Sequence, residues 1–373
     1  MNIKFNEIFD QPCDENEIET LKEINYKTKE IPWVNKYRPK KLSGIIHQKE
    51  VVLMLENTLK TGNLPHLLFY GPPGTGKTST ILALARDLFG PKKFSDRVVE
   101  LNASDERGIN IVRKKIISFA KMSIGNSDDN YLCPPYKIII LDEADAMTHE
   151  AQSALRKVME NNSNITRFCF ICNYINQIIT PISSRCSKFR FLPLNNNSLK
   201  NKLELISKKE KMNINGDILD TIIEISNGDM RKAIMTLQNA NYYLKFNNKI
   251  TIDDIYNIGT YIPKSIMTNL WNNTVLDKSN YSLDKIIIVC NNLKRLSYPI
   301  NNVLKQLTKF IAQEKKLNDY QKSIISYHLL NITKMINDGS SEYLQLINIL
   351  SFIKGTYLNI EYKKLKNKFI FIF

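Results

Sequence analysis

Residues 71–78 have the types and spacing that a nucleotide triphosphate needs. They are Gly-Pro-Pro-Gly-Thr-Gly-Lys-Thr, and their glycines let the backbone curl until successive N–H groups point at phosphate oxygens. Lys77 would bring a positive charge to the β- and γ-phosphates, and the Thr78 hydroxyl would be a ligand for Mg²⁺. The alternative is a glycine-rich turn that carries a lysine by chance. The apolar run before the loop and the helical pattern after it disfavour that alternative.

A second chemical motif is the pair of acids that follows residues 137–141, Lys-Ile-Ile-Ile-Leu. Such an apolar run is typical of a central parallel strand, and ligands bind where parallel strands end. Asp142 would hold the Mg²⁺ shell, and Glu143 would orient and polarise a water against the γ-phosphate. Adjacent acids also occur in ordinary turns. The combination with the phosphate loop therefore carries the prediction of ATP hydrolysis.

Three more polar residues occupy positions that could serve the same site. Asn173 directly follows the apolar run 168–172, where the other strands deliver their ligands. Arg185 precedes a short fifth strand, and an arginine fork suits a transferring phosphoryl group. Such an arginine is normally unremarkable, so its role depends on the neighbouring motifs. Arg231 follows a Gly-Asp pair that can end one helix and cap the next.

Five short apolar runs alternate with helical patterns, which predicts an α/β domain around a parallel sheet. The predicted strands are residues 67–70, 98–101, 137–141, 168–172 and 188–191. The predicted helices are residues 48–60, 79–89, 109–122 and the segment from Ala151 to Met159, capped by Thr148. After a linker near residues 192–197 the pattern is helical, and from about residue 261 four apolar stripes indicate a bundle. His328 lies within one stripe, which favours a packed histidine.

The composition limits the class of protein. A chain of 373 residues is expected to form two or three domains. Its six cysteines show no paired framework, and Cys169 and Cys172 belong to a buried strand without further ligands nearby, which disfavours zinc or redox chemistry. We therefore expect a reduced intracellular compartment. The sequence indicates no secretion signal and no membrane span.

The formal net charge of +15 favours a nucleic acid or another polyanion as a partner. Residues 109–122 form a helix pattern with one basic face, which is either a solvated face or one that follows nucleic-acid phosphates. Residues 32–40 mix aromatic, basic and proline residues, and the prolines discourage a helix there. That segment is either a packed strap or a shelf for an adenine ring.

Taken together, these motifs resemble those of the small subunits of replication factor C, the sliding-clamp loader of the AAA+ class. The resemblance covers about residue 32 to the end and is densest over residues 32–191. Residues 133–136, Cys-Pro-Pro-Tyr, resemble one particular subunit type within this family. The letters D-E-A-D at 142–145 also occur in DEAD-box helicases, but the lead-in to the phosphate loop differs and no second helicase domain follows.

The resemblance implies roles for individual residues. Val34 and Arg38 would contact the adenine and phosphate sides of ATP, Asp142 and Glu143 would be the Mg²⁺ and water-orienting acids, and Asn173 would be a first sensor of the γ-phosphate. The phosphate cradle would consist of Gly71, Pro72, Pro73, Gly74, Thr75, Gly76, Lys77, Thr78 and Ser79.

Three further roles are implied in the same way. Arg231 would be a second sensor, and Arg185 would be a finger inserted into the ATP site of a neighbouring subunit. Arg107, Ile109 and Arg113 would follow template phosphates, which favours the nucleic-acid role for the basic helix.

The resemblance also implies a domain plan and partners. Residues 31–194 would be an α/β AAA+ core, 195–262 a helical lid and 263–373 an all-α collar that joins subunits. Residues 1–30 are outside the resemblance, and their polar composition without sustained periodicity predicts a mobile extension. The expected complex is a nuclear hetero-pentamer that uses ATP and Mg²⁺ to open the sliding clamp (PCNA) and load it on primer–template DNA in replication and repair. Two alternatives remain open at this point: a branch-migration type of AAA+ motor, and a scaffold subunit that binds ATP without hydrolysing it.

Overall fold

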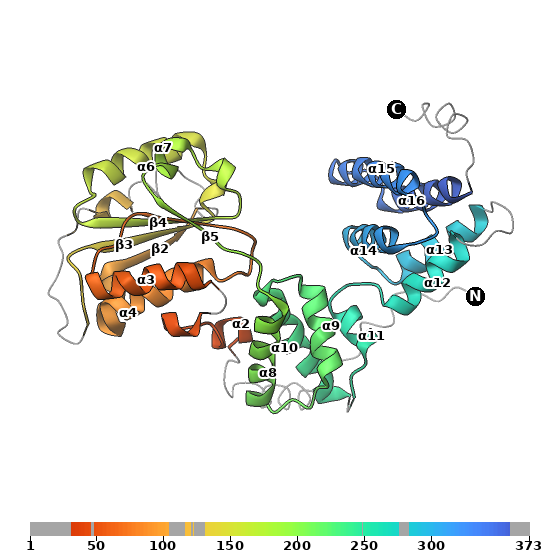
Figure 1. Cartoon of the computed structure of the whole chain (residues 1–373), viewed down its shortest axis with the longest axis horizontal. Helices are drawn as coiled ribbons and strands as arrows, with labels where there is room; N and C mark the ends of the chain where they lie inside the picture. The colour runs from red at the N-terminus through yellow and green to blue at the C-terminus, as the bar shows by residue number, and fades with distance from the viewer. Residues whose placement is uncertain are drawn as a thin grey trace, which may run out of the picture. The chain divides into compact units, whose positions relative to one another are not determined.

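The computed structural model describes residues 31–45, 48–103, 116–120, 122, 131–247, 249–275 and 283–358. The chain forms two compact units, residues 1–38 and residues 39–373. Figure 1 shows the helices and strands of both units along the chain.

The described part of the first unit contains one short helix, α2 (Trp33–Lys36). The expectation that prolines keep residues 32–40 out of a helix was wrong for this turn. Pro32 is the N-cap, a position where its missing N–H removes no intrahelical hydrogen bond. The helix ends at Lys36, the N–H of the C-cap Tyr37 donates to the Trp33 carbonyl at 2.9 Å, and Pro39 follows soon after. The prolines therefore limit the length of the helix instead of preventing it.

The second unit begins with a five-stranded parallel sheet in the order β2-β3-β4-β1-β5. Its strands are β1 (Leu67–Tyr70), β2 (Val98–Asn102), β3 (Lys137–Asp142), β4 (Thr166–Cys172) and β5 (Ser187–Arg190). All five predicted strands are confirmed: β1 has the predicted ends, and the ends of the other four differ by at most two residues. Because the strands are parallel, the residues that follow β1, β3 and β4 lie at one edge of the sheet.

Alternate residues along each strand enter separate cores on the two faces of the sheet. Phe69 belongs to a core shared with α3 (Lys49–Thr61) and α4 (Lys77–Arg97). Leu68 belongs to a core shared with residues 116–120 and with α6 (His149–Asn161). Figure 1 shows α3 and α4 on one side of the sheet, and α6 with α7 (Thr180–Ser183) on the other. This is the layered α/β architecture that the sequence predicts.

Two local features refine the predicted helices. The first stretch of α4 ends at Phe89 as predicted, because Gly90, with φ of 67° and ψ of 171°, is not helical, and a second helical stretch from Pro91 completes the range of α4. Helix α6 begins as predicted, because the Thr148 side chain accepts a hydrogen bond from the Ala151 N–H at 3.3 Å. Among the described residues of this region, three 3₁₀ turns connect elements: η1 (Leu42–Gly44), η2 (Ala144–Ala146) and η3 (Ile175–Gln177).

A group of four helices follows the sheet: α8 (Asn196–Lys209), α9 (Gly216–Ser226), α10 (Met230–Phe246) and α11 (Ile252–Ile258). Side-chain caps fix several of their starts. Asn195 accepts from the Ser198 N–H, and Asp229 accepts from the Lys232 N–H at 3.1 Å. The Asp229 cap sets the first turn of α10, which contains Arg231.

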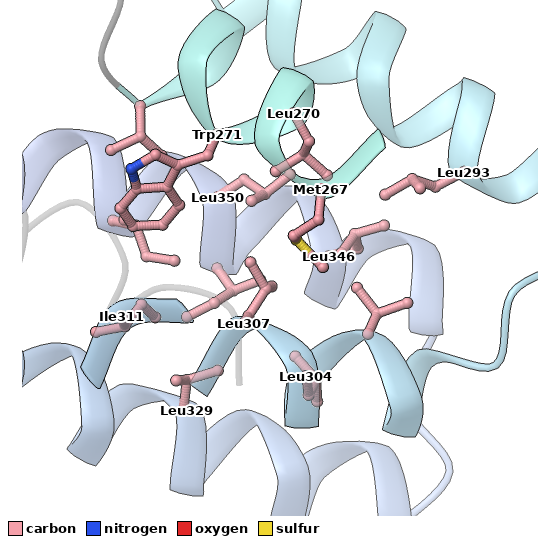
Figure 2. Packing of buried hydrophobic residues seen from close by; sticks show 14 of the residues in the cluster. Met267, Leu270, Trp271, Leu293, Leu304, Leu307, Ile311, Leu329, Leu346 and Leu350 are labelled. Carbon is pink, nitrogen blue, oxygen red and sulfur yellow. The ribbon is translucent and has the colours of Figure 1, made fainter. Parts of the chain in front are cut away.

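The remaining helices form an all-α bundle: α12 (Lys264–Thr274), α13 (Leu283–Arg295), α14 (Ile300–Gln313), α15 (Asp319–Asn337) and α16 (Glu342–Tyr357). Figure 2 shows its core, in which Trp271 lies among side chains that include Leu307, Ile311 and Leu350. The predicted stripes meet in this core. His328 stacks on Phe352 with ring centroids 3.9 Å apart, and burial lowers its pKa, in agreement with a packed histidine. Among the described helices none has the length and hydropathy to cross a membrane.

Candidate nucleotide site

The phosphate loop connects the end of β1 to the start of α4, at the edge of the sheet where the strands end. Gly71 has a φ of 146°, and a Cβ added there would lie 2.2 Å from the Phe191 carbonyl oxygen. Gly76 has a φ of 94°, and a Cβ added there would meet nothing within 4 Å. Gly71 therefore allows close packing onto the chain after β5, whereas Gly76 combines a left-handed turn with open space for a ligand.

Lys77 is buried where the loop meets β4, and its ammonium group has three acceptors. Nζ donates to the Gly71 carbonyl at 2.7 Å, to the Pro72 carbonyl at 2.9 Å and to Asn173 Oδ1 at 3.0 Å. Burial lowers its pKa, which the Asp142 carboxylate opposes. The structure thus brings together Lys77 of the predicted cradle and Asn173, the predicted first sensor, although 96 positions separate them in the sequence.

The two residues predicted to bind Mg²⁺ are also adjacent. The Thr78 hydroxyl donates to Asp142 Oδ2 at 2.7 Å. A hydroxyl and a carboxylate are oxygen donors of the kind that Mg²⁺ prefers, and this ion usually keeps several waters besides one or two protein ligands and the substrate phosphates. The described residues contain no group of three or more His, Cys, Asp or Glu side chains that could hold a metal by themselves. The donor set therefore fits Mg²⁺ bound together with a nucleotide.

Glu143 lies immediately after β3 and is exposed. Its φ of 54° is in the left-handed region, which is uncommon for a residue with a side chain. The Glu143 N–H donates to Asp142 Oδ1 at 3.0 Å, so one Asp142 oxygen holds this turn while the other accepts from Thr78. Backbone strain of this kind is concentrated at functional sites.

Asp145 also contributes to the geometry of this site, although the sequence pattern did not indicate it. Its Oδ2 accepts hydrogen bonds from the backbone N–H groups of Asn173, at 2.9 Å, and of Tyr174, at 3.2 Å. These bonds fix the chain after β4 with Asn173 beside Lys77. The sequence shows an acid two residues after Glu143, but it does not show that this acid binds the backbone of Asn173 and Tyr174.

The start of α10 contacts the phosphate loop. The Met230 N–H donates to the Gly74 carbonyl at 3.2 Å, and Gly74 packs directly against the Asp229 carboxylate. Arg231, the predicted second sensor, is close enough to Lys77 to contribute to lowering its pKa. The structure therefore brings the first turn of α10 to the same loop as Lys77.

This contact makes Gly74 sensitive to substitution. Gly74 has a φ of 70°, and a Cβ there would lie 1.6 Å from Asp229 Oδ1. We expect Gly74→Ala to displace Asp229 and to weaken ATP binding about tenfold, since the cradle and the first turn of α10 would no longer fit together. Titration calorimetry with ATP would measure the loss. Gly216→Ala, where an added Cβ meets nothing within 4 Å, is the matched control, and equal affinity of the two variants would contradict the expectation.

The remaining predicted site residues are Arg185, two residues of the first compact unit and three residues outside the described part of the chain. Arg185 lies just after α7, where its Nη1 donates to the Pro181 carbonyl at 2.8 Å and its Nη2 is 2.7 Å from Glu160 Oε1. Val34 and Arg38 belong to the first compact unit. Arg107, Ile109 and Arg113 lie outside the described residues.

Comparison with family models divides the chain into three matches. Residues 67–194 match the "ATPase family associated with various cellular activities (AAA)", residues 201–241 match an "RCF1/5-like, AAA+ ATPase lid domain", and residues 264–351 match the "Replication factor C C-terminal domain". The matches follow the order of the sheet, the four-helix group and the bundle. They agree with the predicted α/β core followed by a lid and an all-α domain.

Whole-chain relatives agree with these matches. The chain is 45% identical to replication factor C subunit 4 of Arabidopsis thaliana, over 86% of this chain and 94% of the relative. It is 46% identical to replication factor C subunit 4 of Homo sapiens, over 88% and 89% respectively. A solved RuvB variant of Thermotoga maritima is 17% identical with a TM-score of 0.49, covering 72% of this chain and 91% of that one. The RuvB likeness is too distant to bear on activity.

Proposed function

Because the chain belongs to the family of replication factor C small subunits, we propose that it is an ATP-binding and ATP-hydrolysing subunit of a sliding-clamp loader. The observation that carries this proposal is the convergence of Lys77, Asn173 and the Thr78–Asp142 pair at one edge of the sheet. Lys77 supplies the charge for the β- and γ-phosphates, and Asn173 lies where it can detect whether the γ-phosphate is present. Arg231, in the first turn of α10, would respond to the bound nucleotide and so couple the lid to the ATP site.

Hydrolysis would depend on Glu143 and on a metal ion. Mg²⁺, when bound by Thr78 and Asp142 partly through water, would neutralise charge between the β- and γ-phosphates. Glu143 would orient the attacking water. It directly follows Asp142, whose carboxylate accepts a hydrogen bond from the Thr78 hydroxyl, and its exposed side chain can reach solvent. Val34 and Arg38 would hold the adenine and phosphate sides of the nucleotide.

The proposed partners follow from the family and from the charge. The chain would join other replication factor C subunits in a hetero-pentamer through the bundle of residues 263–373, and it would work in the nucleus. The complex would hold an opened sliding clamp (PCNA) and primer–template DNA, with Arg107, Ile109 and Arg113 following template phosphates. A formal net charge of +15 supports a nucleic-acid partner. Contact with DNA and clamp would stimulate ATP hydrolysis, which lowers affinity for both.

The two alternatives are less well supported. A branch-migration motor would need its own DNA-engaging domain after the lid, whereas residues 264–351 match the replication factor C C-terminal domain. A scaffold that binds ATP without hydrolysing it would not require Lys77, Asp142, Glu143 and Arg185 all to be intact. The Arg185 guanidinium contacts Pro181 and Glu160, whereas Lys77 donates to Gly71, Pro72 and Asn173, and we propose that Arg185 serves another subunit's site.

Arg185→Ala tests the proposed action on a neighbouring subunit. In an assembled loader whose only intact ATP site belongs to the subunit that receives Arg185, we expect hydrolysis to fall at least about 100-fold, because an arginine finger stabilises transition-state charge. Arg190→Ala, an exposed arginine on β5, is the control. Unchanged hydrolysis at the partner's site would show that Arg185 is not the finger.

A further inference from the structure

The Arg185 guanidinium is already held by two acceptors of its own chain. Nη1 donates to the Pro181 carbonyl at 2.8 Å, and Nη2 is 2.7 Å from Glu160 Oε1. A guanidinium has five N–H donors, so these two contacts leave three donors for another ligand. The Arg185 side chain is 38% exposed, so the guanidinium is held through both of its terminal nitrogens and is still accessible.

Glu160 is itself fixed by a second arginine. Arg156, one turn earlier on α6, donates from Nε to the same Oε1 atom at 3.0 Å. Hydrogen bonding to Arg156 is the main cause of the lowered pKa of Glu160, and the charge of Arg185 contributes. The carboxylate therefore remains ionised at neutral pH. One carboxylate between two arginines leaves the group with a net charge of +1, which still attracts a phosphate.

We propose that Glu160 is a positioning residue for Arg185, which it holds in the orientation that reaches the γ-phosphate of ATP bound to a neighbouring subunit. The proposal rests on the role of Arg185 proposed above. An arginine side chain has many rotamers, and a group that acts in a transition state works best when its geometry is set beforehand. Glu160 and the Pro181 carbonyl provide two fixed points, one on α6 and one on α7, and so restrict the fork to one arrangement.

The two elements that carry these points are connected independently of Arg185. The Gln152 amide of α6 donates to the Gln177 carbonyl at 2.9 Å, and its Oε1 accepts from the Ile179 N–H at 2.9 Å. Helix α6 is therefore attached to the chain that leads into α7. Loss of the exposed Glu160 should free the Arg185 side chain without separating the two helices.

The test uses the assembled loader in which only the neighbouring subunit's ATP site is intact. We expect Glu160→Ala to lower kcat at that site about tenfold and to change KM for ATP less than about twofold, because a misdirected catalytic group affects the transition state more than substrate binding. Glu160→Gln keeps an oxygen acceptor for Arg185, so it should restore most of the rate. Glu150→Ala, an exposed acid in the first turn of the same helix, is the control, and each variant's own-site ATP affinity checks its fold.

Arg185→Ala and the double variant Arg185→Ala/Glu160→Ala separate the possible outcomes. If Glu160 acts through Arg185, the double variant should be no slower than Arg185→Ala alone. If Arg185→Ala is slow but Glu160→Ala is as fast as the wild type, or faster, the positioning role is refuted and the finger stands. If Arg185→Ala itself has no effect, both the finger and the positioning role are refuted.

Discussion

Glu143→Gln is expected to leave ATP binding intact and to reduce hydrolysis at this subunit's site about 100-fold or more, because the amide cannot accept a proton from the attacking water. The substitution keeps the size of the side chain and the exposed left-handed turn in which Glu143 lies. ATP affinity measured by titration should therefore stay within about twofold of the wild type, because Glu143 does not belong to the proposed phosphate cradle. Single-turnover hydrolysis in the assembled loader would give the rate.

The same variant should trap the loader on its clamp and DNA, since release is proposed to follow loss of the γ-phosphate. Glu150→Gln, on the exposed first turn of α6, serves as the control. Normal turnover by Glu143→Gln at this site would mean that another group orients the water.

Lys77→Met is expected to lower ATP affinity at least about 100-fold, because it removes a charge that would contact two phosphates and is already desolvated. The methionine keeps the aliphatic stem but leaves the Gly71 and Pro72 carbonyls and Asn173 Oδ1 without their shared donor. The loop should lose its link to β4 as well as its charge. Titration with ATP would measure the affinity.

A fold control is needed for this variant, because Lys77 is buried. Thermal unfolding without nucleotide should show a cooperative transition for both proteins, and added ATP should raise the midpoint only for the wild type. An ATP-dependent rise of equal size in Lys77→Met would contradict the role given to Lys77.

Much of the site could be predicted because it depends on local sequence. The phosphate loop, the two acids and the amide each follow an apolar run, namely β1, β3 and β4. Parallel strands bring such positions to one edge of the sheet. The Thr78–Asp142 hydrogen bond at 2.7 Å and the Lys77–Asn173 hydrogen bond at 3.0 Å confirm that these positions meet. The Thr148 cap was predictable for the same local reason.

The contacts that could not be predicted join segments far apart in the sequence. Asp145 fixes the backbone after β4, Asp229 packs on Gly74, and Glu160 binds Arg185. From the sequence alone, Glu160 is only an acid close to Arg156 and Lys157 on the same helix. Its pairing with an arginine 25 positions later depends on how α6 and α7 pack on the sheet.

The short helix α2 and the kinked end of α4 show a second limit of sequence patterns. Proline and glycine usually end helices, but Pro32 is the N-cap that starts α2, and the interruption of α4 at Gly90 is followed at once by a second helical stretch that begins at Pro91. The outcome depends on the position of each residue within its turn. The periodic pattern of apolar residues does not record that position.

The most direct test of the central claim is ATP turnover by this chain alone and after assembly with the other loader subunits, with and without sliding clamp and primed DNA. The clamp-loader function predicts feeble turnover alone and a sharp rise only when partners, clamp and primed DNA are all present. Vigorous turnover by the isolated chain together with strand unwinding would contradict it in favour of a self-sufficient motor. Tight ATP binding without turnover under any of these conditions would contradict the hydrolytic role and leave a scaffold subunit.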